Sequence, residues 1–296
     1  MKHVVVIGSK NSGSKNDPAV IAANLSSGDV SVVQIYWEDL VFQIKTSSVE
    51  VLSNGQDILA HKPELFIALG WYKNGKDAIY RDVAYSLSLV LDSRGIDYWN
   101  SEMGHQRSTT KLSTMVQLAL ANIPVPTTDF SLTTTNILSA WHFPFIAKAV
   151  AASRGKNNFL VTDEAVLEQV KLSGEKFLIQ NFIENDHDLR VICFNSKPSL
   201  VLRRARAKDS STHLNNTSQG GSARWLALSD LSTSVLTLTE RISTITRREL
   251  AGIDLIPDAA SPVGYSCLEV NSIPQLTSGT DTEKKMATLA AVVDQL

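Results

Sequence analysis

One short stretch, Cys267-Leu268-Glu269-Val270-Asn271, combines the apolar pattern of a strand with a carboxylate and an amide. Two other apolar runs also carry charges, namely Phe145-Ile146-Ala147-Lys148-Ala149-Val150 and Val201-Leu202-Arg203-Arg204. A charge on a buried strand is costly unless it is paired or binds a ligand. One such strand alone is more often an edge strand that faces water, but three in one chain predict a polar cleft.

The first third of the chain alternates strand-like and helix-like segments. Three apolar runs have the length and composition of strands: Val4–Ile7, Val30–Ile35 and Leu65–Leu69. Apolar residues then recur at helical spacing from Asp77 to Leu91. This order predicts an α/β unit with a parallel sheet. We place its boundary near Asn100, which divides the chain into domains of residues 1–100 and 101–296.

Composition narrows the class of protein. The chain has 296 residues, 43% of them hydrophobic, which is enough for about two domains of ~150 residues. The 30 acidic and 28 basic residues give a net charge of -2, so we expect neither nucleic acid nor an anionic membrane as a partner. No apolar stretch approaches the ~20 residues that span a bilayer, and the N-terminal run is too short for a signal peptide. We therefore expect a cytoplasmic protein.

Two further sequence features are explained by ordinary structural roles. Residues 8–15 nearly spell a phosphate-binding P-loop, but Ser14 precedes Lys15 where the motif needs lysine directly after the second glycine. We interpret this segment as a polar loop that could still close over a ligand. Cys193 and Cys267 lie in apolar stretches, which predicts buried, reduced thiols.

The charged residues of the second domain fall into two electrostatic groups. Five cations could neutralise a polyphosphate and a developing oxyanion: Lys111, Lys148, Arg190, Arg203 and Arg204. Three residues offer hard oxygen ligands of the kind that Mg²⁺ prefers: Asp254, Glu269 and Asn271. Small and basic residues fill segment 151–158, whose backbone N–H groups could close over phosphates. Together these groups predict a site for ATP and Mg²⁺.

The order of these segments resembles the ATP-grasp superfamily. Within it, the chain is most similar to the RimK-like carboxylate–amine ligases, which include ribosomal-protein glutamate ligases and relatives of glutathione synthetase. The resemblance rests on Lys111, residues 145–148, 177–183, 188–190 and 203–204, Asn216 before Gly220-Gly221, and residues 251–254 and 268–272. It covers roughly residues 95–290. It implies an α/β protein with an N-terminal parallel-sheet domain before a two-subdomain ATP-grasp fold, with a lid subdomain of about 125–185 and a catalytic subdomain of about 186–296.

The resemblance also implies roles for individual residues. Lys111 and Lys148 would hold the ATP phosphates, and a loop containing Ser153, Arg154 and Gly155 would fold over them. The adenine would be lined by Gln180, Asn181, Phe182 and Ile183. The ribose would face Asp188, with Asp186 and Glu184 as alternatives. One or two Mg²⁺, or Mn²⁺ in its place, would be bound by Asp254, Glu269 and Asn271. The transferred phosphoryl group would lie beside Arg204 and Asn216, and the substrate carboxylate would face Arg190.

The implied activity is ATP-dependent amide-bond formation through an acyl phosphate, with release of ADP and phosphate. The implied substrate is an amino acid or a peptide. Departures from the family pattern at Thr110, Asn181 and Gln275, and a loop with the single glycine Gly155, leave the identity of the substrate open. The alternative is a non-catalytic or regulatory ATP-binding module, which would not need the three metal ligands together with Arg204.

Two other questions stay open at this point. The histidines have no paired spacing that predicts zinc, although His213 lies in a polar stretch that could contact the substrate. The oligomeric state cannot be derived from the sequence, and dimers or tetramers are the symmetric forms to expect if the chain associates.

Overall fold

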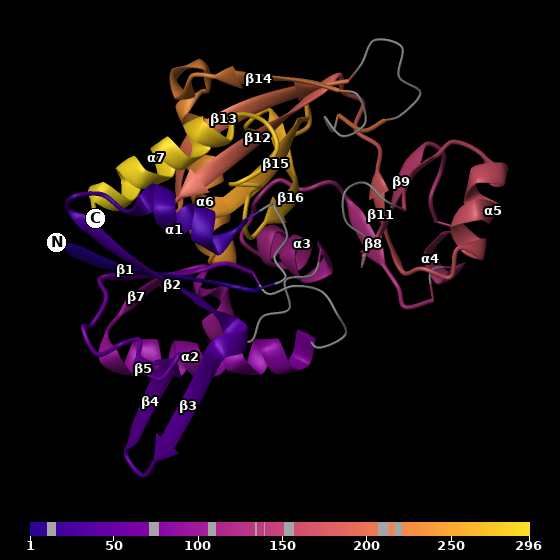
Figure 1. Cartoon of the computed structure of the whole chain (residues 1–296). Helices are drawn as coiled ribbons and strands as arrows, with labels where there is room; N and C mark the ends of the chain where they lie inside the picture. Colours follow the sequence, from indigo (N-terminus) through magenta and orange to yellow (C-terminus); the bar gives the residue numbers. More distant parts are fainter. Residues whose placement is uncertain are drawn as a thin grey trace.

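The computed structural model describes residues 1–10, 16–70, 77–105, 111–133, 135–138, 140–150, 157–206, 213–215 and 221–296. Figure 1 shows three groups of elements, each built around its own sheet. In the described parts of the chain, no helix combines the length and the apolar character that crossing a membrane requires.

The N-terminal group contains a parallel sheet in the order β2-β1-β6-β7. Its elements are β1 (Lys2–Gly8), α1 (Pro18–Leu25), β2 (Val30–Tyr36), β6 (Leu65–Ala68), α2 (Asp77–Arg94) and β7 (Asp97–Trp99). Side chains alternate across β1, so Val4 and Val6 pack toward α1 while Val5 and Ile7 pack toward α2. Both faces of the sheet are therefore buried, as expected for parallel strands, and the predicted parallel sheet is confirmed.

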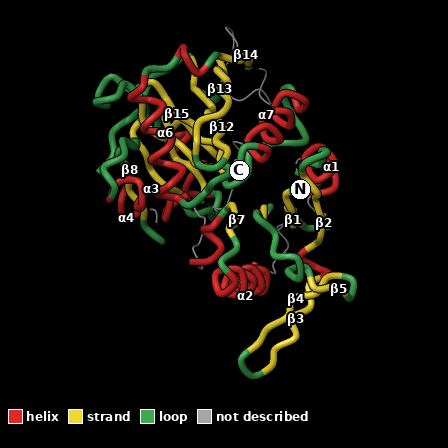
Figure 2. The backbone as a smooth tube through the Cα atoms, turned by 90° about the vertical axis from the view of Figure 1, so that its left-hand side faces the viewer, coloured by secondary structure: helices red, strands yellow, loops and turns green. Residues whose placement is uncertain are grey.

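A small antiparallel sheet projects from this group, as Figures 1 and 2 show. Its strands are β3 (Leu40–Lys45), β4 (Ser48–Ser53) and β5 (Gln56–Asp57), in the order β3-β4-β5. The short helix η2 (Trp37–Asp39) leads from β2 into the hairpin.

The second group is a four-stranded antiparallel sheet in the order β10-β9-β11-β8. Its elements are β8 (Thr128–Phe130), α4 (Thr135–Leu138), β9 (Phe145–Ala149), β10 (Asn158–Val161), α5 (Glu164–Leu172) and β11 (Phe177–Asn181). The helix α5 begins after Asp163, whose side chain accepts a hydrogen bond from the Val166 N–H at 3.0 Å.

The third group is a five-stranded antiparallel sheet in the order β14-β13-β12-β15-β16. Its strands are β12 (His187–Phe194), β13 (Lys197–Ala205), β14 (Ser222–Leu226), β15 (Ala251–Pro257) and β16 (Tyr265–Asn271). One face packs on α3 (Lys111–Leu120) and α6 (Thr233–Thr246), in a core that includes Leu118, Val191 and Ile242. The short helix η5 (Leu228–Asp230) also belongs to this group, whereas η3 (Ser101–His105) packs against α2 of the N-terminal group.

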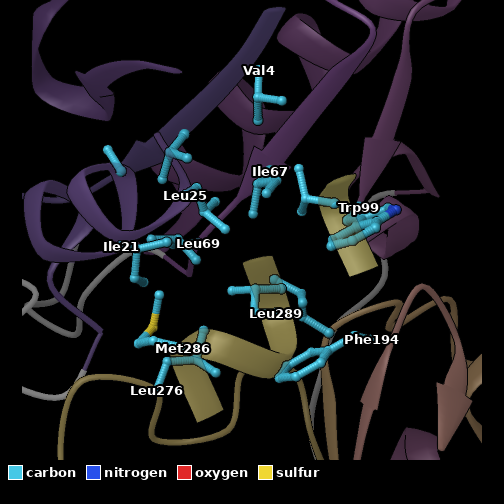
Figure 3. Close-up of a cluster of buried hydrophobic side chains, with 14 of the residues drawn as sticks. Val4, Ile21, Leu25, Ile67, Leu69, Trp99, Phe194, Leu276, Met286 and Leu289 are labelled. Carbon is cyan, nitrogen blue, oxygen red and sulfur yellow. The ribbon is translucent and has the colours of Figure 1, made fainter. Parts of the chain in front are cut away.

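The C-terminal helix α7 (Thr282–Asp294) joins the first and third groups. Figure 3 shows one buried cluster in which Ile21 and Leu25 of α1 lie close to Met286 and Leu289 of α7, with Phe194 of β12 beside them. Because the same cluster contains side chains of the parallel sheet and of the large antiparallel sheet, the two groups share one hydrophobic core.

Candidate active site

The register of the large sheet brings five charged side chains to one face. Asp188 and Arg190 of β12 are two residues apart, so they point to the same side. Arg204 of β13 is the cross-strand partner of Asp188, and Asp254 of β15 is the partner of Arg190. Glu269 of β16 pairs in turn with Asp254. Two of the charged runs that the sequence singled out, 201–204 and 267–271, therefore contribute to one surface of the large sheet.

Two arginine–aspartate pairs occupy this surface. Arg204 contacts Asp188 through Nε at 2.6 Å and through its terminal nitrogen at 2.9 Å. Arg190 contacts Asp254 in the same two-point manner, with both distances 2.8 Å. A further contact of 3.1 Å joins Arg204 to Asp254. The result is a connected network in which one carboxylate, Asp254, receives two guanidinium groups.

Electrostatics keep this network charged. Burial acts to raise the pKa of Asp254, but the charges of Arg190 and Arg204 outweigh it and hold the pKa at about 2. Burial acts to lower the pKa of Arg204, but Asp254 and Asp188 raise it above its ordinary value. Asp254 and Arg204 are therefore ionised at neutral pH, whereas burial raises the pKa of Asp188 above its ordinary value.

The small sheet supplies the opposite wall of the site. Lys148 of β9 extends across to β16, where its Nζ lies 3.9 Å from Glu269 and donates to the Leu268 carbonyl at 3.3 Å. Lys111, the first residue of α3, donates to the Val150 carbonyl at 3.4 Å. Lys148 thus faces a carboxylate of the large sheet, and Lys111 contacts the end of the small sheet.

A cleft lies between these walls, with an empty volume of about 940 Å³ that includes the part open to solvent. Ten of the predicted site residues line it: Lys111, Lys148, Gln180, Asn181, Phe182, Ile183, Asp188, Arg204, Asp254 and Glu269. Arg190 and Asn271 lie outside the lining, although Arg190 contacts the lining residue Asp254 from the neighbouring strand. The predicted Ser153, Arg154, Gly155 and Asn216 lie outside the described residues, as do Thr110 and residues 11–15 of the N-terminal loop.

Arg203 differs from the sequence-based grouping of the basic residues. Successive side chains on a strand point to opposite faces, so Arg203 lies on the side of β13 away from Arg204 and from the cleft. It instead lies 3.7 Å from the exposed Asp186. Period-two alternation in the run 201–204 would have shown that only one of its two arginines could reach the site.

The structure also adds residues that sequence reasoning missed. Near the ends of β11 and β13, Asn215 donates to the Asn185 side chain at 2.7 Å, and Arg206 donates to the carbonyls of Asn185 and His213 at 3.0 Å each. Asn215 is 5% exposed and lines the cleft, where its side-chain oxygen has no hydrogen-bond partner among the residues that the structure describes. Sequence reasoning singled out the neighbouring Asn216 and passed over Asn215.

His213 connects the two walls of the cleft. Its Nε2 lies 3.2 Å from the Asn158 side-chain oxygen at the start of β10. Burial, followed by the charge of Arg206, lowers the pKa of His213 to about 4. The imidazole is therefore neutral near pH 7, and its contact with Asn158 is a neutral hydrogen bond. The structure places His213 on the lining of this cleft.

Asp188 has its two carboxylate oxygens engaged by Arg204. This geometry favours a role in orienting Arg204 over the ribose contact that the resemblance implied. Asp186, one alternative for the ribose, is 83% exposed and pairs with His187 at 2.5 Å. The ribose contact stays a prediction.

The oxygen ligands chosen from the sequence fit Mg²⁺ by their chemistry. Asp254 and Glu269 are cross-strand neighbours, and Asn271 lies two residues beyond Glu269 on the same face of β16. Carboxylate and amide oxygens are hard donors of the kind that Mg²⁺ takes together with phosphate oxygens. Among the described residues, no three His, Cys, Asp or Glu side chains gather into a metal-binding group, so the set depends on an amide as its third member.

A buried arginine supports this strand from behind. Arg248 is 3% exposed and pairs with Glu102 at 2.8 Å. It also donates to the carbonyl of Val270, the residue between Glu269 and Asn271. Its third contact, 3.3 Å to the Thr114 hydroxyl, reaches α3. The pattern of charged strands gave no indication of Arg248, because it lies between secondary-structure elements.

Comparison with known families identifies residues 108–292 as a RimK-like ATP-grasp domain. This match covers more than half of the chain, and the protein belongs to the RimK-like ATP-grasp family. Membership places it among the ATP-grasp ligases, enzymes that use ATP to form carbon–nitrogen bonds. The family and the class of enzyme inferred from the sequence are confirmed.

Similar proteins of known sequence carry a consistent name. A probable alpha-L-glutamate ligase of Trichodesmium erythraeum (strain IMS101) is 26% identical over 240 residues, which are 74% of this chain and 78% of that protein. A probable alpha-L-glutamate ligase of Legionella pneumophila (strain Corby) is 24% identical over 194 residues, which are 63% of this chain and 62% of that protein.

Among solved structures, the ATP-grasp ligase PsnB complexed with a phosphomimetic variant of minimal precursor, Mg and ADP superposes with a TM-score of 0.71. The two are 15% identical, and the alignment covers 100% of this chain and 98% of PsnB. At that identity the likeness shows the fold alone, and it confirms the predicted α/β ATP-grasp architecture.

Proposed function

We propose that this protein transfers the γ-phosphoryl group of ATP to a substrate carboxylate and then joins the resulting acyl group to an amine. The observation that carries the proposal is the cleft itself, in which Lys148 of the small sheet faces Asp254 and Glu269 of the large sheet. Cations on one wall and hard oxygen ligands on the other are what a nucleotide polyphosphate with its divalent cation requires.

The nucleotide would lie along the lining residues of β11 and its extension. Backbone groups of residues 180–183 would contact the adenine edge, and Lys111 and Lys148 would hold the phosphates. Asp254, Glu269 and Asn271 would hold Mg²⁺, which when bound neutralises phosphate charge during phosphoryl transfer. Arg190 and Arg204 already contact Asp254 in this structure, so Mg²⁺ would share this carboxylate with the two guanidinium groups.

The first chemical step forms a bond between a substrate carboxylate oxygen and the γ-phosphorus, while the bond from that phosphorus to the bridging oxygen of ADP breaks. Arg204, which lines the cleft beside Asp254, would offset the charge that develops on the transferring group. Asp188 would keep the Arg204 guanidinium in a fixed orientation, so little reorganisation accompanies the reaction.

In the second step the amine nitrogen attacks the acyl carbon, phosphate leaves with its bonding electrons, and the nitrogen loses a proton. The tetrahedral oxyanion needs fixed donors, and Arg204 would supply them. Arg190, with its side chain 22% exposed, stays our candidate for contact with the substrate carboxylate. Closure of the small sheet over the cleft would exclude water from the acyl phosphate.

We infer an amino acid or a peptide as the substrate class. The relatives named probable alpha-L-glutamate ligase support an amino acid, and the ligase PsnB, solved with a minimal precursor, supports a peptide. L-Glutamate is therefore the first carboxylate and the first amine to test.

The experiment measures ADP and phosphate released by the purified protein with Mg-ATP, against amino acids, dicarboxylates and short peptides, with mass spectrometry of the products. The proposal predicts ADP release only with a matching carboxylate and amine, and a product mass equal to their sum less water. Release of AMP and pyrophosphate would replace the acyl phosphate with an adenylate. ATP binding without turnover across the whole panel would favour the regulatory module.

A further inference from the structure

The segment that follows β16, residues 272–278, crosses the cleft-facing side of the large sheet. Pro274 lies over Gly252 of β15, where an added Cβ would be 3.5 Å from the Pro274 Cβ. Gly252 is two residues before Asp254, so both face the same side of the sheet. The segment therefore lies beside the Arg190–Asp254 pair, at the end of the site where we place the substrate carboxylate.

Two other parts of the chain contact this segment. The Leu276 N–H donates to the Asn16 side chain at 2.9 Å. The Asp17 N–H donates to the Thr277 hydroxyl at 3.1 Å. Leu276 is fully buried, and Figure 3 shows it beside Met286 of α7. The segment thus connects the N-terminal group with the large sheet and with α7.

A buried ammonium group fixes the same segment. Lys285 of α7 is 3% exposed. Its Nζ donates to the Gln275 carbonyl and, at 2.7 Å, to the Ser278 carbonyl. In the described part of the chain, the hydrogen-bond partners of this ammonium group are carbonyl oxygens rather than carboxylates. Because taking an ammonium group out of water is costly without an ionic partner, packing alone does not account for a lysine at this position.

The ammonium group of Lys285 also lies near the active site. Burial, opposed by the charge of Asp281 and assisted by the charge of Arg190, lowers the pKa of Lys285 to about 8. Lys285 is therefore close enough to Arg190 for the two charges to interact, and it is mostly protonated at pH 7. The segment that it fixes and the arginine that would contact the substrate carboxylate thus belong to one neighbourhood.

We propose that Lys285 is a positioning residue for binding of the substrate carboxylate, and that it acts through residues 272–278. By donating to two carbonyls three residues apart, it fixes the turn that borders the Arg190 end of the cleft, so the substrate meets a preorganised wall. An apolar side chain of similar length would fill the same space but would leave both carbonyls without this donor. The inference rests on the proposed function, which assigns the substrate carboxylate to Arg190.

Lys285→Met tests the effect on the substrate. It is expected to raise KM for L-glutamate, or for the panel substrate that is turned over, at least ~10-fold. KM for ATP should change less than ~2-fold, because we place the nucleotide along β11. Lys284→Met, at the exposed neighbouring position on α7, is the matched control and keeps both constants. Leu289→Ala destabilises the same helix and should also leave the substrate KM unchanged. An unchanged substrate KM in Lys285→Met, or an equal rise in Leu289→Ala, overturns the proposal.

Hydrogen exchange of the full chain tests the same contacts without turnover. In Lys285→Met, the amides of a peptide covering residues 272–279 are expected to exchange at least ~10-fold faster than in the wild-type protein, while those of β15 keep their rates. Lys284→Met should match the wild-type protein throughout. Equal exchange in Lys285→Met and the wild-type protein overturns the proposal. A wild-type protein that turns over no substrate of the panel would refute the proposed function instead, and the exchange result would still decide whether Lys285 fixes the segment.

Discussion

At the scale of single residues, the site depends on charges that the fold has taken out of water. Asp254 is 6% exposed and Arg204 is 5% exposed, and each is tolerated because it has a partner within hydrogen-bonding distance. The sequence predicted that these charges would gather, because each interrupts an apolar strand. It could not predict which arginine pairs with which aspartate, because that depends on the cross-strand register.

Glu269 offers the cleanest test of the metal site. Its side chain is 33% exposed, so Glu269→Gln is expected to leave the fold unchanged while ADP formation falls at least ~100-fold. The loss is expected to be partly recovered at high Mg²⁺, because one oxygen ligand has been weakened. Glu168→Gln, on the exposed face of α5, is the matched control and keeps full activity. Full turnover by Glu269→Gln would remove Glu269 from the site.

Asp254 gives a prediction for stability and its dependence on pH. Removing its charge leaves Arg190 and Arg204 without a common partner, so Asp254→Asn is expected to lower the free energy of unfolding by about 3–5 kcal/mol. The pKa of Asp254 is lowered from 3.8 to about 2, so its contribution is complete above pH ~4 and is lost as the pH falls toward 2.

Urea unfolding followed by tryptophan fluorescence, at several pH values between about 2 and 6, measures this effect. The wild-type protein should lose more stability over that interval than Asp254→Asn does. Parallel curves for the two proteins would show that Asp254 is not held by the arginines.

At the scale of elements, much of the framework could be read from sequence pattern. The strands β1, β2 and β6 and the helix α2 lie where periodicity predicted them. The hairpin of β3 and β4 was not predicted, although Leu40, Phe42 and Ile44 alternate as a strand requires. The contacts that bring segments together, such as those of Arg248, depend on tertiary structure and have no local signal.

Arg248 links three elements of the site, so its replacement should affect metal binding as well as stability. Arg248→Met leaves the Glu102 carboxylate buried and unpaired, which predicts a loss of about 3–5 kcal/mol. Because Arg248 also holds the Val270 carbonyl, the Mg²⁺ concentration for half-maximal activity is expected to rise about 10-fold.

The double variant Arg248→Met/Glu102→Leu separates these two effects. It should recover much of the stability, because no buried charge is left unpaired, while the higher Mg²⁺ concentration for half-maximal activity persists. If the Mg²⁺ dependence recovers together with stability, Arg248 has a purely structural role.

At the scale of the whole molecule, the shared core argues against independent domains. The division near Asn100 was inferred from local pattern, but the cluster around α7 contains Ile21 from one side of that boundary and Phe194 from the other. Local sequence could not reveal this shared core, because the pattern of an amphipathic helix shows its apolar face but not the surfaces against which that face packs. The N-terminal group and the large sheet are therefore expected to unfold together.

Leu289 tests this cooperativity. It is fully buried between the two groups, so Leu289→Ala is expected to lower stability by about 2–5 kcal/mol and to shift one calorimetric transition without splitting it. Leu120→Ala, at a position 81% exposed, should change stability by less than ~0.5 kcal/mol. Two separate transitions in either protein would show that the core does not couple the groups.

The central claim is that a substrate carboxylate is activated as an acyl phosphate in the cleft between Lys148 and Glu269. The most direct measurement follows ¹⁸O from a labelled carboxylate, with L-glutamate first, in reactions with Mg-ATP and the panel of amines and peptides. We predict ADP together with phosphate that carries one ¹⁸O per amide formed, and loss of both signals in Glu269→Gln. Label recovered in AMP, with pyrophosphate as the second product, would contradict the account.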